Sequence, residues 1–399
     1  MQVSIKPSTG KGDINIPSSK SYTHRLLIAS ALSNDISYVD NVSLSDDINA
    51  TISCLASLGY KCNKNENGYY FSNDIKTNEI LDCHESGSTL RFFIPLALVK
   101  GGKFIFKGTP KLFSRGLDPY INLFNDHNID YELGNDYLKI NGKFNGGTYI
   151  IDAAKSSQYL TGLCLALPLA ANDSKIIIKN NISSYNYLLI TLDVLKKYHI
   201  NYNFKDNEII IFGNQHYYFH KEIAVIDYSN AAFLDALNLF GSNININNKN
   251  NHSLQSDANY DKYFEMLKNG TPTIDLDNNI DLGPILFCLA SYFNGATFIN
   301  TSRLKMKESN RIDDVLTELK KFNCVNYLVF DNKIIIGKNN LQKPSDILSS
   351  HNDHRIAMAL SVLLTIFGGK IDNAEAVNKS YPNFYHDLIT LGFEVEIND

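Results

Sequence analysis

Six stretches of this sequence are apolar on nearly every side when drawn as helices, and each follows a polar turn. They cover residues 26–32, 90–99, 159–171, 231–240, 282–293 and 356–367. A helix without a polar face has to be buried, so we expect all six to pack against sheets. The turns before them open at Ser18, Ser86, Ser156, Asp227, Asp281 and His351. Polar openings on buried helices indicate that these turns serve a purpose other than solubility.

The same order of elements recurs around each apolar stretch. Gly or Asn follows five of the six, as at Gly101-Gly102, and this is typical of a helix end. A short β-rich run and an amphipathic helix come next, as at 104–106 and 117–124. Hairpin-like pairs separate the units, so the sequence predicts an α/β fold of six βαβαββ units. We expect two domains of three units each, covering 1–19 with 227–399 and 20–226.

Composition excludes several classes of partner. The 399 residues include 37 basic and 42 acidic side chains, so the net charge of −5 gives no general attraction to nucleic acid or to anionic membranes. The six cysteines form no CxxC pair, which indicates reduced thiols and no structural zinc. No signal peptide and no apolar run long enough for a membrane span is present. We therefore expect a soluble cytoplasmic protein.

Serines at the helix openings suit an anion. A helix N-terminus offers unpaired N–H groups and positive dipole charge, so Ser156-Ser157 and Ser183-Ser184 are candidate phosphate sites, although spacing alone favours simple N-capping. Cations stand at equivalent turns: Lys20, Arg25, Arg91, Arg115, Lys307, Arg311, Arg355 and Lys379. Each alone is explained by solvation at the surface. Together they predict a substrate that carries a phosphate and a carboxylate.

Three carboxylates lie among these cations and are candidates for proton transfer: Asp281, Glu308 and Asp353. The alternative for each is a structural ion pair. His351 and His354 flank Asp353, but no further ligand pattern joins them, so we expect no metal. The chain also lacks a P-loop, a G-x-G-x-x-G turn and a G-x-S-x-G elbow, which leaves nucleotide cofactors and serine hydrolysis unsupported.

Six ordered motifs between residues 7 and 390 carry a resemblance to a known family. They are PSSKS at 17–21 with Arg25, ESGSTLR at 85–91, SSQYL at 156–160, KESNR at 307–311, NDHR at 352–355 and KSYP at 379–382. Together they resemble the EPSP synthases, the 3-phosphoshikimate 1-carboxyvinyltransferases of the shikimate pathway. The resemblance implies a two-domain inverse α/β barrel that closes over its substrates.

The resemblance also implies a reaction. The enolpyruvyl group of phosphoenolpyruvate passes to the 5-hydroxyl of shikimate 3-phosphate, phosphate leaves, and the tetrahedral intermediate is not bonded to the enzyme. It implies no metal or organic cofactor and no nucleic-acid or membrane partner, and we expect a monomer.

Site residues follow from the resemblance position by position. Shikimate 3-phosphate would meet Lys20, Ser21, Arg25, Ser156, Ser157, Gln158, Ser184, Tyr187, Asp281, Arg303 and Lys307. Phosphoenolpyruvate would meet Lys20, Gly87, Arg91, Arg115, Gln158, Arg311, Arg355 and Lys379. Asp281 would accept the proton of the 5-hydroxyl, Glu308 would protonate the methylene carbon, and Lys20 and Lys307 would assist both substrates.

The sequence departs from the family pattern at Glu85, Ile280 and Arg303, where Asn, Pro and Asn are usual. One alternative is the related transferase that acts on UDP-N-acetylglucosamine. That family carries a Cys in the turn at 109–116 and an Asn after the first-helix Lys, whereas this turn has no Cys and Ser21 follows Lys20. Another alternative is a non-catalytic anion-binding relative, against which Asp281 and Glu308 argue.

Overall fold

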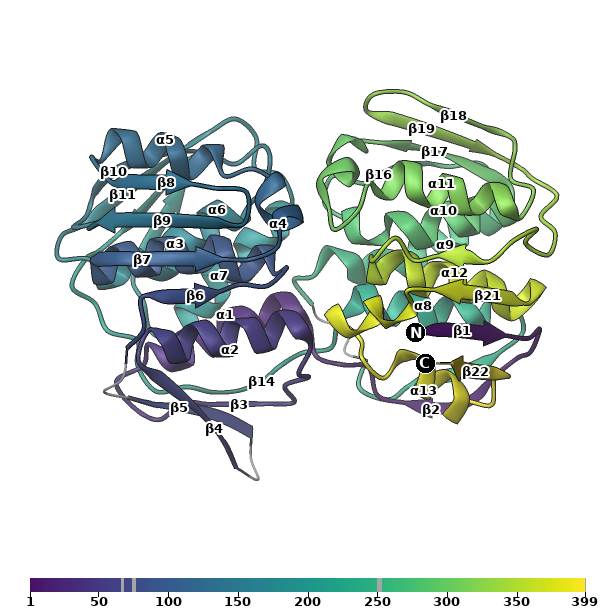
Figure 1. The fold of residues 1–399 in the computed structure, drawn as a ribbon, viewed down its shortest axis with the longest axis horizontal. Coiled ribbons are helices and arrows are strands. Elements are labelled where there is room, and N and C mark those ends of the chain that lie inside the picture. The colour runs from purple at the N-terminus through teal and green to yellow at the C-terminus, as the bar shows by residue number, and fades with distance from the viewer. Residues whose placement is uncertain (66–67, 74–76, 250–252, 399) are drawn as a thin grey trace. The chain divides into compact units, whose positions relative to one another are not determined.

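The computed structural model describes residues 1–65, 68–73, 77–249 and 253–398 (Figure 1). The chain forms two compact units, each with its own apolar core. The central unit comprises Ser18–Val225, and the terminal unit combines Met1–Pro17 with Ile226–Asp399. The chain therefore passes between the units twice, once after Pro17 and once after Val225.

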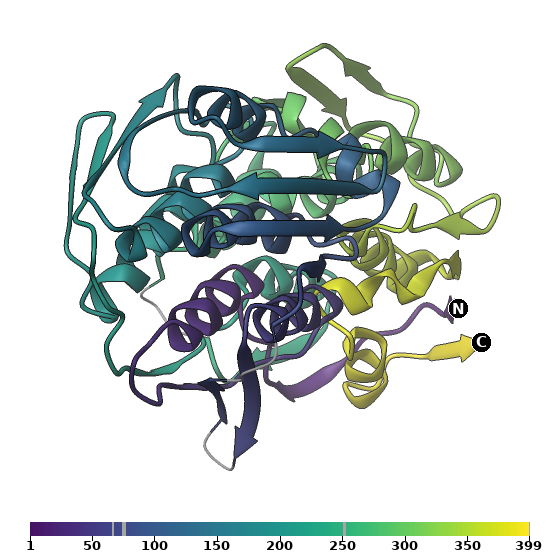
Figure 2. The same ribbon diagram turned by 60° about the vertical axis from the view of Figure 1, so that its left-hand side comes forward.

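Three four-stranded sheets form the central unit. Their strand orders are β14-β3-β5-β4, β6-β7-β9-β8 and β10-β11-β13-β12. The strands are β3 (Tyr38–Asp40), β4 (Tyr60–Asn65), β5 (Gly68–Asn73), β6 (Ile80–Asp82), β7 (Gly102–Lys107), β8 (Asp130–Leu133), β9 (Tyr137–Gly142), β10 (Gly147–Asp152), β11 (Ser174–Lys179), β12 (Tyr202–Lys205), β13 (Glu208–Ile211) and β14 (Lys221–Ile223). Figures 1 and 2 show β7, β8 and β9 side by side, with helices on one face of their sheet.

The central helices include three that are buried along nearly their whole length, α1 (Lys20–Ala31), α3 (Gly87–Lys100) and α6 (Gln158–Ala166). They pack on one another and on the amphipathic helices. The other helices are α2 (Asp46–Ser57), α4 (Pro110–Ser114), α5 (Asp118–Asp126), η1 (Leu167–Leu169) and α7 (Tyr185–Lys197). Helix α6 ends before the predicted residue 171, because Pro168 cannot continue it and η1 takes over.

The terminal unit repeats this plan. Its sheets have the orders β20-β21-β1-β22, β16-β17-β19-β18 and β15-β2. The strands are β1 (Gln2–Ile5), β2 (Lys11–Ile14), β15 (Asn243–Ile246), β16 (Thr273–Asp275), β17 (Gly295–Ile299), β18 (Tyr327–Val329), β19 (Lys333–Gly337), β20 (Leu348–Ser349), β21 (Gly369–Asp372) and β22 (Val395–Asn398). The amino-terminal strand β1 thus lies between β21 and β22, in antiparallel register with both.

Buried helices again form the centre of this unit: α8 (Tyr228–Asn238), α10 (Gly283–Tyr292) and α12 (His354–Phe367). The remaining helices are η2 (Ser256–Asn259), α9 (Tyr260–Asn269), η3 (Ile280–Leu282), η4 (Ser302–Met306), α11 (Arg311–Lys321), η5 (Ala374–Lys379) and α13 (Phe384–Thr390). The predicted helix from residue 282 is in fact the short turn η3 followed by α10, so Asp281 lies in a turn of its own before the buried helix.

Strand pairing shows the repeat directly. In each four-stranded sheet one pair is parallel and the next two are antiparallel, as in β6–β7, β7–β9 and β8–β9. Parallel strands need a crossover connection such as a helix, whereas neighbouring antiparallel strands can be joined by a turn. These two kinds of connection, taken in order, give the βαβαββ unit that the sequence predicts. The predicted α/β fold class is confirmed. Among the described residues the sheets stay separate, and β15 pairs only with β2.

Candidate functional site

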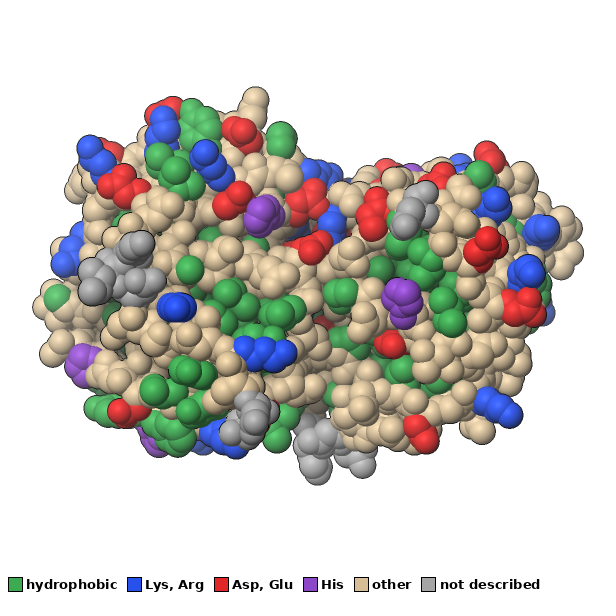
Figure 3. Space-filling view, turned by 60° about the horizontal axis from the view of Figure 1, so that its bottom comes forward, with side chains coloured by type: hydrophobic (Ala, Val, Ile, Leu, Met, Phe, Trp, Pro, Cys, Tyr) green, Lys and Arg blue, Asp and Glu red, His purple; other side chains and the backbone are tan. Residues whose placement is uncertain are grey.

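Four of the eight predicted site cations are buried, and the other four are partly buried. Exposed fractions are 2% for Arg25, 6% for Arg91, 1% for Arg311 and 3% for Arg355. Surface cations look different: on the face in Figure 3, Lys and Arg side chains are scattered among acidic ones. A buried guanidinium loses its hydration and therefore needs specific partners, so solvation at the surface does not explain these four residues.

Arg25 lies in helix α1 of the central unit, and hydrogen bonds hold its whole guanidinium group. Nε donates to Thr191 Oγ1 at 2.8 Å and Nη2 donates to Thr161 Oγ1 at 2.9 Å. Nη1 and Nη2 also donate to the carbonyls of Ser21 and Tyr187. Burial lowers the pKa of Arg25 to about 10, so the group keeps its charge at neutral pH. This network brings predicted residues from α1 and α7 together.

Lys20 is the first residue of α1, and its ammonium pairs with Asp47 Oδ2 of helix α2 at 2.8 Å. Asp47 was not among the residues predicted from the sequence. It lies in the first turn of α2 beside Asp46. Acidic residues are common there because they interact favourably with the helix dipole, so the sequence alone did not indicate a role in the site. The ion pair fixes the position of the ammonium relative to α2.

Gly87 begins helix α3 and lies against two arginines. A Cβ atom placed on Gly87 would come within 3.0 Å of Arg91 Nη1 and 3.1 Å of Arg115 Nη1. Arg91 Nη1 also donates to Gln158 Oε1 at 2.6 Å, and Gln158 Nε2 donates to Ser88 Oγ at 3.0 Å. The structure therefore brings together Gly87, Arg91, Arg115 and Gln158, which the sequence placed on phosphoenolpyruvate.

Some of the serines at the helix starts form local hydrogen bonds with the helix backbone, and others do not. Ser19 and Ser86 cap α1 and α3, because their hydroxyls accept hydrogen bonds from the amides of Tyr22 and Thr89. Ser156 Oγ likewise accepts from the Gln158 amide, at 3.2 Å. N-capping thus accounts for Ser19 and Ser86, and Ser156 forms a local turn bond before α6. Ser157 and Ser184, like Ser156, belong to the predicted phosphate site, and these two occupy N-cap positions without a side-chain capping bond.

Arg311 forms the centre of the site in the terminal unit. Nε donates to Asp353 Oδ2 at 2.7 Å, Nη1 to Asp281 Oδ1 at 2.7 Å and Nη2 to Glu308 Oε2 at 2.8 Å. These carboxylates come from the N-cap of α12, from η3 and from the turn before α11. All three carboxylates suggested by the sequence therefore meet on one guanidinium.

Asp281 is surrounded by positive charge. Besides Arg311, Lys307 Nζ lies 3.4 Å from Oδ1 and Arg355 Nη2 lies 3.8 Å from Oδ2. Burial alone would raise the pKa of Asp281, but Lys307, Arg355 and Arg311 together hold it well below its usual value. The side chain is 18% exposed. An ionised carboxylate that reaches solvent is suited to accept a proton from a substrate.

The pKa of Lys307 is lowered too, but for an ammonium group this favours the neutral form. Burial lowers the pKa of its ammonium to about 8, although Asp281 and Glu308 favour the charged form. Arg303, which the sequence assigned to shikimate 3-phosphate, binds Asp277 in this structure. Its Nη1 donates to the Asp277 carbonyl at 2.9 Å and to the Asp277 carboxylate at 3.3 Å. Arg303 adds positive charge near Lys307. Arg303 thus bonds to Asp277, which lies four residues before Asp281.

Arg355 lies at the start of α12, and Lys379 contacts a residue just before that helix. Arg355 Nη1 donates to Asn230 Oδ1 of α8 at 3.4 Å, and Lys379 Nζ donates to the carbonyl of Asn352 at 2.7 Å. Asp353, the N-cap of α12, accepts from the Arg355 amide. The predicted residues of the NDHR and KSYP motifs are therefore brought together.

Asp257 is a further acidic residue that the sequence did not single out. It lies in η2, is 4% exposed and accepts a hydrogen bond from Asn279 Nδ2 at 3.3 Å. Burial and the charge of Asp281 raise the pKa of Asp257 to about 7, against the opposing effect of Arg355. No motif surrounds Asp257, and only the fold places it near Asp281.

Of the two predicted histidines, His351 interacts with acidic side chains of α11. His351 Nε2 lies 2.8 Å from Glu318 Oε1, and Nδ1 lies 3.4 Å from Asp314 Oδ1. Within the described part of the chain, no group of three or more His, Cys, Asp or Glu side chains is arranged to hold a metal ion. The same residues include no helix with the length and apolar character needed to cross a membrane.

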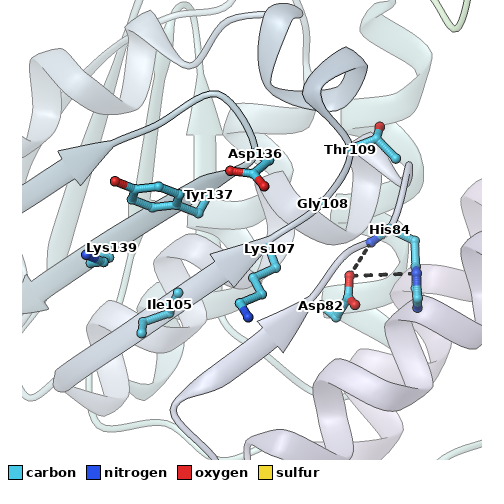
Figure 4. Close-up of a pocket in the computed structure, with 9 residues that line it drawn as sticks. All are labelled: Asp82, His84, Ile105, Lys107, Gly108, Thr109, Asp136, Tyr137 and Lys139. Atoms are coloured by element: carbon cyan, nitrogen blue, oxygen red, sulfur yellow. Dashed lines mark hydrogen bonds and ion pairs between the residues drawn. The ribbon is translucent and has the colours of Figure 1, made fainter.

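A surface cavity of about 640 Å³ lies elsewhere on the central unit (Figure 4). Its lining includes Asp82, His84, Lys107, Thr109, Tyr137 and Lys139. The Asp82 carboxylate there accepts from the His84 amide at 2.9 Å. None of the residues predicted to bind substrate lines this cavity, so it is separate from the two clusters described above.

Fold and clusters together define a class: an α/β protein of repeated βαβαββ units with cations gathered at the starts of buried helices. Two solved EPSP synthase structures from Acinetobacter baumannii share this fold, each with a TM-score of 0.80 and full coverage of both chains, at 19% and 18% identity. Residues 5–388 match the model of a family described as EPSP synthase (3-phosphoshikimate 1-carboxyvinyltransferase). The chain belongs to the EPSP synthase family.

Relatives agree along nearly their whole length. A 3-phosphoshikimate 1-carboxyvinyltransferase of Clostridium novyi is 38% identical, with 98% of this chain and 97% of the relative aligned. One of Clostridium kluyveri is also 38% identical, over 99% and 98% of the two chains. The family resemblance given by the six motifs is confirmed.

The pKa of Lys307 leads to a prediction for any activity that needs its positive charge. The ammonium is lost as pH rises through about 8, so kcat/KM should fall on the alkaline side of that value. Lys307→Arg keeps the charge, because an arginine pKa exceeds about 12, and should move the fall to above about pH 10. Lys305→Arg, at an exposed neighbouring lysine, is the control and should keep the parental profile. An unchanged profile in Lys307→Arg would contradict the assignment.

Proposed function

We propose that this chain transfers the enolpyruvyl group of phosphoenolpyruvate to the 5-hydroxyl of shikimate 3-phosphate. The products are 5-enolpyruvylshikimate 3-phosphate and phosphate. The observation that carries the proposal is the family match over residues 5–388, together with relatives named 3-phosphoshikimate 1-carboxyvinyltransferase that align over nearly their full length. The reaction belongs to aromatic amino acid biosynthesis.

The proposed proton transfers use the carboxylates around Arg311. As the 5-hydroxyl oxygen adds to C2 of phosphoenolpyruvate, Asp281 takes the hydroxyl proton and Glu308 gives a proton to C3. The product is a tetrahedral intermediate with a methyl group. When phosphate leaves C2, Asp281 passes its proton to the departing phosphate, Glu308 takes a proton back from the methyl group, and the double bond forms again. The low pKa of Asp281 keeps its carboxylate ionised, which is the form that can accept a proton.

The cations supply the electrostatic part. Arg311, Arg355 and Lys379 in the terminal unit and Lys20, Arg91 and Arg115 in the central unit are proposed to bind the carboxylate and phosphate of phosphoenolpyruvate, with Gly87 and Gln158 beside them. A positive site lowers the free energy of the departing phosphate relative to water. Guanidinium groups also orient carboxylates and phosphates through paired hydrogen bonds.

Shikimate 3-phosphate is assigned mainly to the central unit. Ser156, Ser157 and Ser184 are proposed for its phosphate, and Lys20, Ser21, Arg25, Gln158 and Tyr187 for the ring. The N-cap position of Ser157 supports this, because a hydroxyl that does not cap its own helix is suited to a ligand. Asp281 and Lys307 complete the proposed contacts, and Arg303 would first have to exchange its hydrogen bonds to Asp277.

The rival substrate UDP-N-acetylglucosamine is not favoured, because the family model and the curated relatives describe the shikimate enzyme. A non-catalytic relative is not favoured either, since both carboxylates stay assembled on Arg311. The addition and elimination require proton transfer and no change of oxidation state, so we propose a reaction without metal or organic cofactor. We also propose a monomer and a cytoplasmic location.

A phosphate-release assay tests the proposed reaction. Purified protein should release phosphate when both phosphoenolpyruvate and shikimate 3-phosphate are present, and not with either one alone. UDP-N-acetylglucosamine in place of shikimate 3-phosphate is the specificity control and should give no phosphate. Absence of release with the proposed pair would refute the function, and release with the control would support the rival transferase.

Glu308→Gln tests the proposed proton donor. The amide keeps the size of the side chain but cannot exchange a proton with C3, so kcat should fall by about 100-fold or more. Binding of shikimate 3-phosphate should change less than about threefold, because the ground-state contacts are proposed for other residues. Steady-state kinetics and calorimetry measure the two quantities. Equal losses in kcat and in binding would show that Glu308 has no specific part in proton transfer.

A further inference from the structure

A chain of buried hydrogen bonds connects helices α1, α2 and α3 of the central unit. His24 Nδ1 lies 2.7 Å from Thr51 Oγ1, and Thr51 Oγ1 lies 2.8 Å from Thr89 Oγ1. Thr89 Oγ1 in turn donates to Ser86 Oγ at 2.7 Å. All four side chains have 0% exposure. Polar groups in such a position need an explanation, since apolar side chains surround them in the same core.

The direction of these hydrogen bonds follows from counting protons. Burial, with the nearby charges of Lys20 and Arg25, holds the pKa of His24 well below its usual value, so the ring is neutral and carries one N–H. The Thr89 proton goes to Ser86, so the Thr89 oxygen accepts from Thr51. Thr51 then accepts from His24, which places the ring proton on Nδ1. Nε2 of His24 is left with no hydrogen-bond partner among the described residues.

The far end of this chain is the start of helix α3. Ser86 Oγ accepts from the Thr89 amide at 3.2 Å and is followed directly by Gly87, which lies against Arg91 and Arg115. Thr89 Oγ1 also lies 3.5 Å from the carbonyl of Asp47. The near end, His24, is one helical turn after Lys20 in α1, and Lys20 pairs with Asp47. The chain therefore joins the three elements that carry Lys20, its partner and Gly87.

A second pair of hydroxyls serves the next residue of α1. Thr161 Oγ1 and Thr191 Oγ1 lie 2.8 Å apart, and both accept from Arg25. Neighbouring residues of one helix thus have separate hydroxyl networks. The His24 network leads to residues proposed for phosphoenolpyruvate, and the Arg25 network holds a residue proposed for shikimate 3-phosphate.

We propose that His24, Thr51 and Thr89 are positioning residues for phosphoenolpyruvate, which fix the start of α3 and with it Gly87, whereas Thr161 and Thr191 position Arg25 for shikimate 3-phosphate. This inference rests on the proposed function. A purely structural role of these hydroxyls can be distinguished from a positioning role. If their removal only loosened the core, the Michaelis constants for both substrates would change together. Positioning predicts that each network affects one substrate.

Substitutions of near-equal shape separate the two cases. Thr51→Val removes the hydroxyl at nearly constant volume, and KM for phosphoenolpyruvate should rise about fivefold, the loss of one typical hydrogen bond, with KM for shikimate 3-phosphate changing less than about twofold. Thr51→Ser keeps the hydroxyl and should restore the parental value. Thr191→Val is the matched control and should show the opposite pattern. Thr89→Val with Thr89→Ser provides a second pair if Thr51→Val does not fold.

The outcomes distinguish this inference from the proposed function. A parental protein without turnover overturns the function and the inference with it. If the parent is active, equal changes of both Michaelis constants, or an unchanged KM for phosphoenolpyruvate in folded Thr51→Val and Thr89→Val, overturn only the inference. Failure of the serine variants to restore the parental KM also overturns it, because the hydroxyl would then not be the group that matters.

Discussion

One buried guanidinium, that of Arg311, joins the three carboxylates of the terminal unit's site. It is 1% exposed and bonds to Asp281, Glu308 and Asp353. Because these carboxylates come from η3, the turn before α11 and the start of α12, a single side chain fixes the geometry among three elements. It also keeps acidic groups together that would repel one another without it. The proposed acceptor and the proposed donor are therefore defined by the same residue.

Such a network is an unusual way to stabilise a fold. Removing charges from water costs several kcal/mol per ion, and apolar replacements of buried ion pairs are often neutral or stabilising by about 1–4 kcal/mol. Stability here is better explained by the two apolar cores, in which helices such as α3 and α12 are buried along nearly their whole length. The charges are then accounted for by chemistry: Asp281 stays ionised, and Lys307 has a pKa of about 8.

Periodicity and motif spacing predicted what depends on local sequence. The βαβαββ order, the buried helices and the cations at their starts are all visible in short windows, because burial and capping act over a few residues. Contacts between distant residues were not predictable. Asp257 near Asp281, Asp47 on Lys20, and the chain from His24 to Ser86 join segments whose approach only the fold determines. Arg303, assigned by its position in the sequence, forms hydrogen bonds to Asp277.

The central claim is that Asp281 is held ionised by Arg311, Lys307 and Arg355, and carbon-13 NMR of aspartate carboxyls measures this directly. The Asp281 signal can be assigned from its loss in Asp281→Asn. As the pH is lowered to 4, its shift should remain that of a carboxylate, because its pKa lies well below the usual value. A signal that moves toward the protonated shift already at pH 5 would contradict the account.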